Sequence, residues 1–252
     1  MPNPPVSPRL LLLSNSTNHG AWFLEHATDT IRDFLGPATA ELLFVPFAAV
    51  RIDWNAFTEK VRDRLGPLGY KVTSVHAARD PAGAVRAAGA IAVGGGNTFH
   101  LLETLAHRGL LAPIRERVKA GIPFVGWSAG ANIACPTIRT TNDMPIVEPP
   151  SLDALGFLPF QINPHYTDAR MPDHSGETRA ERLLEFVEVN PDMPVLGLRE
   201  GSILRVEGAA MTLLGEKPAR LFRKGREPED VAPGPLAPSL LAAPAKSATP
   251  AG

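Results

Sequence analysis

The feature that most constrains the fold of this chain is the alternation of short apolar runs with longer stretches of helical periodicity. The apolar runs predict strands at Arg9–Leu13, Glu41–Phe47, Lys71–Val75, Ala88–Val93 and Pro123–Trp127. The stretches between them predict helices at about Ala21–Leu35, Trp54–Leu65, Thr98–Arg108 and Leu111–Ala120. Strands that alternate with helices form βα units, and strands this apolar are expected where helices cover both faces of a sheet. The sequence therefore predicts an α/β fold with a mostly parallel sheet sandwiched by helices.

The second half of the chain follows a looser pattern and ends in a segment of different composition. Beyond Pro136 we expect a helix over Glu177–Val189 and strands near Phe157–Ile162, Val195–Leu198, Ser202–Val206 and Met211–Leu214. These elements give one α/β domain over residues 9–226, after a flexible Pro-rich extension over residues 1–8. Residues 227–252 are rich in Pro and Ala and lack aromatic residues, which predicts a disordered tail. An alternative is a partner-binding segment that uses Leu236, Leu240 and Leu241.

Composition argues against several classes of partner. Lys and Arg number 25 against 26 Asp and Glu, which gives no reason to expect binding to nucleic acid or to an anionic membrane. The single Cys135 cannot form an internal disulfide, and no apolar run approaches the ~18 residues that span a bilayer. The first residues also lack the basic and apolar regions of a signal peptide. We therefore expect a cytoplasmic protein, and the sequence leaves open whether it is a monomer or a homodimer.

The most informative stretch for function is Gly126-Trp127-Ser128-Ala129-Gly130, which directly follows a predicted strand. Gly-x-Ser-x-Gly between a strand and a helix is typical of a nucleophile elbow, where the serine occupies a sharp turn with strained backbone angles. The small flanking residues let the two arms of the turn pass closely. The hydroxyl is then exposed at the carboxyl end of the sheet, where ligands bind in open α/β folds. Because Gly-rich turns are common, the pattern alone leaves a purely structural turn open.

A serine nucleophile needs a base, and His165 is the best placed of the seven histidines. It lies just beyond a predicted strand, where loops usually carry catalytic side chains. Histidines within predicted helices are expected to have structural roles. Cys135 follows Ser128 by seven residues, and we expect it to be a small buried residue.

A second Gly-rich turn, Gly94-Gly95-Gly96-Asn97, also follows a strand and begins a helix. It matches neither a Walker A loop nor a dinucleotide-binding fingerprint. Its backbone N–H groups can approach a substrate oxygen closely, so Gly95 and Gly96 are candidate oxyanion donors together with the amide of Ala129. A turn that only packs a helix tightly is the alternative. No pattern of metal ligands is present, so no metal site is predicted.

A series of longer motifs extends over most of the chain. It comprises Leu11–Thr17 (LLLSNST), Val93–Phe99 (VGGGNTF), Trp127–Asn132 (WSAGAN), Cys135–Pro145 (CPTIRTTNDMP), Gln161–His165 (QINPH) and Gly176–Arg179 (GETR). In content and order these motifs closely resemble the peptidase E family, the cytoplasmic aspartyl dipeptidases also called dipeptidase E. The likeness covers about residues 9–224, nearly everything before the predicted tail.

The resemblance implies a flavodoxin-like α/β sandwich related to class I glutamine amidotransferases. It also implies a serine peptidase, without metal or organic cofactor, that removes an N-terminal Asp from dipeptides. By position, Ser128 is the implied nucleophile and His165 the implied general base. Two acids match the family's third role, Glu200 and Asp143. Arg199 stands where the family commonly has Pro before that Glu, which is a departure in the loop that carries Glu200.

The candidate acids and cations can be weighed on physical grounds. We favour Glu200 as the acid because it follows a predicted strand whose end meets the edge of the sheet where Ser128 lies. Asp143 lies in a polar run, where it can satisfy backbone N–H groups or bind the substrate amine, and it stays a second candidate. A buried substrate Asp side chain needs a cation, and Arg offers a two-pronged partner. Arg179 is the position implied by the family, with Arg139 second and Asn97 as a further substrate-binding candidate.

Two other functions stay open at this point. A cyanophycinase-like or isoaspartyl-cleaving peptidase would share the serine site but need room for a longer, branched substrate. A non-catalytic protein of the same fold would bind a small acidic ligand. The presence of the serine, the histidine and both acids argues against the second, because a retired enzyme is expected to lose at least one of them.

Overall fold

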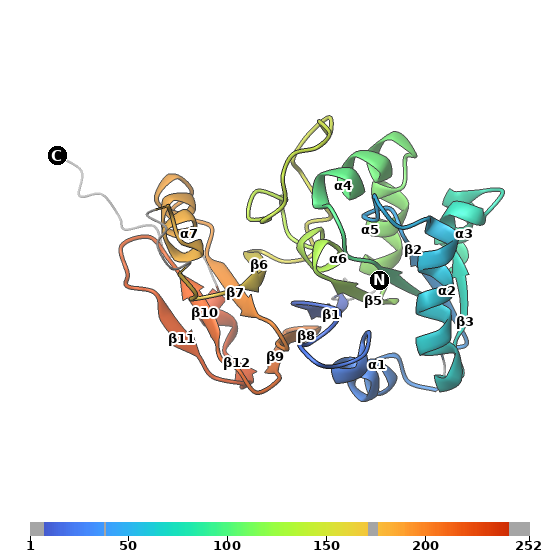
Figure 1. Cartoon of the computed structure of the whole chain (residues 1–252), viewed down its shortest axis with the longest axis horizontal. Coiled ribbons are helices and arrows are strands. Elements are labelled where there is room, and N and C mark those ends of the chain that lie inside the picture. Colours follow the sequence, from blue (N-terminus) through green and yellow to red (C-terminus); the bar gives the residue numbers. More distant parts are fainter. Residues whose placement is uncertain (1–7, 38, 171–175, 242–252) are drawn as a thin grey trace, which may run out of the picture.

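The structure is a computed structural model that describes residues 8–37, 39–170 and 176–241 (Figure 1). Its main sheet has eight strands in the order β12-β9-β8-β1-β5-β4-β2-β3. The five parallel strands of this sheet are β1 (Arg9–Leu13), β2 (Glu41–Val45), β3 (Lys71–Ser74), β4 (Ala90–Val93) and β5 (Pro123–Trp127). The antiparallel strands are β8 (Ile203–Glu207), β9 (Ala210–Leu214) and β12 (Gly234–Leu236). The predicted mostly parallel sheet is confirmed.

Helices cover both faces of this sheet because alternate residues of the central strands face different cores. Leu10 and Leu12 of β1 join a core that includes residues of α4 (Thr98–His107) and α5 (Leu111–Lys119). Leu11 and Leu13 join a second core with residues of α1 (Thr28–Leu35) and α2 (Trp54–Leu65). All four leucines are fully buried. In Figure 1, α1 and α4–α6 accordingly lie on opposite sides of β1 and β5, which confirms the predicted sandwich.

Apart from one helix beside the second sheet, which is described below, the remaining helical segments are short. They are α3 (Pro81–Ala87), α6 (Ala129–Asn132), and the 3-10 turns η1 (Glu25–Ala27), η2 (Gly66–Leu68), η3 (Val75–Ala77) and η4 (Pro238–Leu241). The predicted helix over Ala21–Leu35 begins only at Thr28. Its first part is interrupted because Leu24 has a φ of +55°, which a helix cannot accommodate.

A second sheet of four strands, which the sequence did not predict, forms the left-hand part of Figure 1 together with α7 (Arg179–Val189). Its order is β11-β10-β7-β6, with β6 (Gln161–Tyr166) parallel to β7 (Val195–Arg199). The strand predicted near Phe157–Ile162 thus begins later and runs further. As a result His165 lies within a strand and not in a loop after it.

The end of the described chain differs from the predicted disordered tail. β10 (Ala219–Phe222) pairs with β11 (Glu229–Val231), and β12 completes the edge of the main sheet. Val231, Leu236 and Leu241 are at most 8% exposed and belong to the larger core. Two sheet edges supply backbone partners, so these few apolar side chains suffice to order a Pro-rich segment. Residues 242–252, and all of the predicted N-terminal extension except Pro8, lie outside the described residues.

Candidate active site

The turn between β5 and α6 has the geometry of a nucleophile elbow. Ser128 lies between the two elements with φ 54° and ψ −116°, and its N–H donates to the carbonyl of Leu13 on β1. A Cβ on Gly126 would lie 2.1 Å from the carbonyl oxygen of Gly130, and one on Gly130 would lie 2.0 Å from that of Val93. Only glycine fits at these two positions, so the Gly-x-Ser-x-Gly spacing follows directly from how closely the backbones pack.

His165 lies opposite this serine, and its Nε2 is 3.0 Å from Ser128 Oγ. The His165 backbone also has a positive φ of +55°, where the register between β6 and β7 shifts. Ser14 holds this irregular backbone: its Oγ accepts a hydrogen bond from the His165 N–H at 2.9 Å and donates to the Leu198 carbonyl at 2.7 Å. The end of β1 thereby fixes the imidazole against the elbow.

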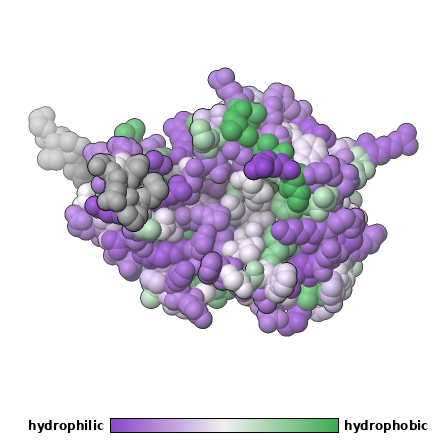
Figure 2. Space-filling view, viewed as in Figure 1, coloured by the Kyte–Doolittle hydropathy of each residue, from purple (hydrophilic) through white to green (hydrophobic). Residues whose placement is uncertain are grey.

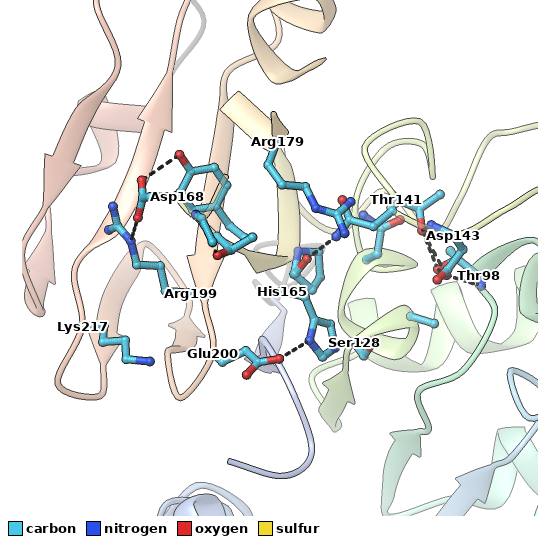
Figure 3. Close-up of a pocket in the computed structure, with 17 residues that line it drawn as sticks. Thr98, Ser128, Thr141, Asp143, His165, Asp168, Arg179, Arg199, Glu200 and Lys217 are labelled. Carbon is cyan, nitrogen blue, oxygen red and sulfur yellow. Dashed lines mark hydrogen bonds and ion pairs between the residues drawn. The ribbon is translucent and has the colours of Figure 1, made fainter. Parts of the chain in front are cut away.

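The structure brings Glu200, and not Asp143, to the histidine (Figure 3). Glu200 Oε1 is 2.8 Å from His165 Nδ1, at the start of the turn after β7. This turn is fixed because the Gly201 N–H donates to Asn15 Oδ1 at 2.8 Å. With a proton on Nδ1 directed at Glu200, Nε2 is free to accept the serine hydroxyl proton.

Asp143 instead caps the start of α4. Its Oδ2 accepts hydrogen bonds from the N–H and hydroxyl of Thr98 and from the hydroxyl of Thr141. The other carboxylate oxygen, Oδ1, has no hydrogen-bond partner within the described ranges. Asp143 still lines the same cavity as Ser128, so it is available to a ligand there.

Gly95 and Gly96 lie directly beside the serine. A Cβ on Gly95 would be 3.0 Å from Ser128 Cβ, and one on Gly96 would be 2.1 Å from the carbonyl oxygen of Ala48. Neither glycine N–H has an acceptor among the residues that the structure describes. Ala129 directly follows Ser128 and begins α6. The arrangement leaves backbone donors beside the hydroxyl, where an oxyanion would form.

A polar cavity of about 850 Å³ opens beside Ser128 and His165. Its lining combines residues next to the main sheet, such as Thr98, with residues of the second sheet, such as Arg199. Three cations contribute to its lining: Arg179, Arg199 and Lys217. Arg199 is occupied, since it pairs with Asp168 at 2.7 Å and with Asp230 at 3.0 Å. Arg179 and Lys217 form no ion pair within the described part of the chain, so their charge is available to a ligand.

Arg179 is the first residue of α7, whose N-terminus is closed by a capping box between Thr178 and Glu181. From there the side chain extends over His165 toward the loop that carries Thr141 and Asp143 (Figure 3). Burial lowers the pKa of the guanidinium, an effect that Arg182 increases and Asp143 opposes. A cation that is partly desolvated and lacks a direct partner gains most from an anionic ligand.

The remaining predicted residues have other places. Asn97 caps α4, with Oδ1 accepting from the His100 N–H at 3.0 Å and Nδ2 donating to the Met144 carbonyl at 2.9 Å. Arg139 is exposed and does not line the polar cavity. Cys135 is fully buried, and desolvation raises the pKa of its thiol to about 12, which fits the structural role expected of it.

Sequence reasoning missed several residues of the site, among them Ser14, Thr98 and Lys217. Ser14 stands in the LLLSNST motif and Thr98 in VGGGNTF, so the motifs contained a signal but gave no role. Lys217 precedes β10, a strand that the sequence did not predict. No group of His, Cys, Asp and Glu suited to a metal ion occurs among the described residues, nor any helix there long and apolar enough to cross a membrane.

Comparisons with known proteins agree with this architecture. The family model described as Peptidase family S51 matches residues 10–214. A Peptidase E of Streptomyces coelicolor is 54% identical over 236 residues, which covers 92% of this chain and 94% of that protein. A Peptidase E of Nostoc sp. is 47% identical over 228 residues, which covers 90% and 94%.

Two crystal structures share the fold. A peptidase from an acI-B1 actinobacterium has a TM-score of 0.66 at 18% identity, covering 92% of this chain and 97% of that one. A putative Peptidase E protein from Listeria monocytogenes has a TM-score of 0.62 at 21% identity, covering 82% and 98%. At these identities the two structures support the arrangement of helices and strands alone.

Proposed function

This chain belongs to peptidase family S51 and is a serine-type dipeptidase, and we propose that it cleaves the bond after an N-terminal aspartate with Ser128 as the nucleophile. The observation that carries the proposal is the line of contacts from Glu200 through His165 to Ser128, beside a cavity that contains Arg179. No metal or organic cofactor takes part in this proposal.

In the first half of the reaction, the Ser128 hydroxyl gives its proton to Nε2 of His165 as Oγ bonds to the carbonyl carbon of the substrate Asp. Glu200 accepts the hydrogen bond from Nδ1 and stabilises the imidazolium that forms. The oxyanion lies between the N–H groups of Ala129 and of Gly95 or Gly96. The C–N bond then breaks as the imidazolium protonates the leaving amine.

In the second half, a water molecule replaces the departed amine. His165 takes a proton from this water, whose oxygen bonds to the acyl carbon, and the ester bond to Ser128 breaks as Oγ regains a proton. Free aspartate leaves, and the serine and histidine return to their starting protonation states.

Selection of aspartate follows from the charges of the polar cavity. The guanidinium of Arg179 can form a bidentate pair with the substrate side-chain carboxylate. The free Oδ1 of Asp143 can accept a hydrogen bond from the substrate's N-terminal ammonium. Recognition of both groups requires a substrate with Asp at its first position. For the location and the oligomeric state the expectation is the one from the sequence, a cytoplasmic protein that is a monomer or a homodimer.

The test is hydrolysis of Asp-Leu, β-Asp-Leu and Ala-Leu by the purified protein, with Ser128→Ala as the inactive control. We expect Asp-Leu to be cleaved fastest. The rate of Ser128→Ala should be lower by a factor of ~10⁴–10⁶, as is typical when a member of a catalytic triad is removed. Preference for β-Asp-Leu would replace the proposal with an isoaspartyl peptidase. Retention of more than a tenth of the activity by Ser128→Ala would disprove the assignment of the nucleophile.

A further inference from the structure

A second cavity, of about 810 Å³, also borders Ser128. Ser128 and His165 line both cavities, whereas Gly95 and Gly96 line only the second and Ala129 only the first. A carbonyl oxygen held between these two sets of amides would have its acyl residue in the polar cavity. The group on the other side of the scissile bond would then enter the second cavity.

We propose that this second cavity binds the leaving residue of the dipeptide and selects an apolar amino acid with a free C-terminal carboxylate. The inference rests on the proposed function, which assigns the acyl residue to the polar cavity. It adds a preference for the second residue of the substrate and the residues that produce it.

The apolar part of the preference follows from three exposed side chains in the lining. Val50 is 53%, Ile52 40% and Ile146 51% exposed, although each is large and hydrophobic. They come from the loop after β2 and from the loop that follows Asp143. Figure 2 shows hydrophobic side chains gathered on this face of the molecule. Apolar side chains that gather at the mouth of a cavity indicate a binding surface, because covering them removes apolar area from water.

The carboxylate part of the preference follows from two cations, Arg51 and Lys60, in the same lining. None of the described lining residues is acidic, and neither cation has an ion-pair partner in the part of the chain that the structure covers. By contrast Arg62, two residues further along α2, pairs with Glu59. Two unpaired positive charges around an apolar surface complement a residue that is apolar in its side chain and anionic at its C-terminus.

Aromatic contacts hold Lys60 at the second cavity. Its ammonium lies 4.4 Å from the centre of the Phe23 ring, and Phe23 packs edge-on against Trp127 at 6.0 Å. Trp127 directly precedes Ser128. The position of the charge relative to the nucleophile is thus set by packed rings and not by a free loop.

The experiment compares kcat/KM for Asp-Leu, Asp-Leu amide and Asp-Gly in the wild type, Lys60→Met, Arg51→Met and Ile52→Asn. We expect Asp-Leu to be the best substrate. The loss caused by Lys60→Met or Arg51→Met should be about tenfold larger on Asp-Leu than on its amide, since only Asp-Leu presents the carboxylate. The loss caused by Ile52→Asn should be larger on Asp-Leu than on Asp-Gly. Lys119→Met, an exposed charge at the end of α5, is the matched control.

Equal losses on Asp-Leu and its amide in both cation variants would overturn the assignment of the carboxylate. Equal losses on Asp-Leu and Asp-Gly in Ile52→Asn would overturn the apolar preference. Both outcomes leave the proposed function intact, because the wild type still cleaves after Asp. Absence of any cleavage after Asp by the wild type would instead refute the proposed function and this inference with it.

Discussion

Two of the three described non-glycine residues with positive φ, Ser128 and His165, face each other across the site. A left-handed backbone disfavours a residue with a Cβ by roughly 1–2 kcal/mol, so both conformations must be held by their surroundings. Close packing of Gly126 and Gly130 holds the first, and the Ser14 hydroxyl holds the second. Strain that is kept at both partners of one hydrogen bond is consistent with preorganisation for the proposed reaction.

The acid behind His165 is tested by comparing Glu200→Gln with Asp143→Asn, each of which removes the charge and keeps the shape. We expect Glu200→Gln to lose ~10⁴ in kcat, as the analogous change does in serine proteases, because the amide no longer stabilises the imidazolium. Asp143→Asn should mainly raise KM, since its proposed contact is with the substrate ammonium. Steady-state kinetics on Asp-Leu decide, and a larger kcat loss for Asp143→Asn would reverse the assignment.

Arg179→Met tests the proposed contact with the substrate side chain. We expect kcat/KM for Asp-Leu to fall by the equivalent of roughly 2–5 kcal/mol, while the slow cleavage of Ala-Leu changes little. Arg139→Met, at an exposed position away from the cavity, is the matched control. Equal losses on both dipeptides would assign Arg179 a structural role.

What sequence could predict at this scale depended on how local the signal is. Ser128 was identifiable because its strain is produced by glycines two residues away. The sequence favours Glu200 over Asp143 because it follows a predicted strand, but the contact with His165 itself depends on where distant segments of the chain lie, which no local pattern contains. The sequence did not predict a role for Lys60 or Arg51 for the same reason. A single cation in a helix or a loop becomes a binding candidate only when the fold brings it near the serine.

At the scale of elements, the site depends on the close approach of α6 to the ends of β4 and β5. Gly130→Ala places a Cβ against the Val93 carbonyl, a backbone atom that cannot move without shifting β4. We expect a loss of about 1–3 kcal/mol in the free energy of unfolding together with a lower kcat. Gly66→Ala is the control, because a Cβ there would meet nothing closer than 4.0 Å. Denaturant unfolding gives the stability of Gly130→Ala and Gly66→Ala, and steady-state kinetics give their kcat. Equal stability of the two variants would contradict the argument.

Elements with a strong apolar pattern were predicted well, and those held by distant partners were not. β1, β5 and α2 have the predicted bounds because burial on one or both faces sets their sequence. The second sheet was missed because β10 and β11 are short and partly charged, and they are strands only through each other and β7. The sequence did not predict α3 either, because this helix is only seven residues long and contains Gly83, so its helical periodicity is weak.

At the scale of the whole molecule, the departure at Arg199 and the end of the chain belong together. Arg199 reaches from β7 to Asp168, after β6, and to Asp230 on β11, and it lies over the ring of Tyr166. These contacts join three segments directly before Glu200. The hydrogen bond from Arg199 also lowers the pKa of Asp168. The segment that the sequence left outside the domain thus supports the loop that carries the proposed acid.

The end of the described chain is packed against the domain and is not a disordered tail. Leu241 is 1% and Leu236 7% exposed, and both pack in the larger core. Replacing Leu241 with Ala should lower the free energy of unfolding by about 2–5 kcal/mol, the usual range for a buried leucine, and Leu236→Ala should act in the same direction. Val189→Ala, at a side chain that is 80% exposed, should change the free energy of unfolding by no more than about 0.5 kcal/mol. Thermal unfolding of the three variants decides, because a disordered tail would leave all three melting temperatures at the wild-type value. Leu236 and Leu241 lie far from the cavity in sequence. If kcat per folded molecule also falls in these two variants, this edge of the sheet helps to position Glu200.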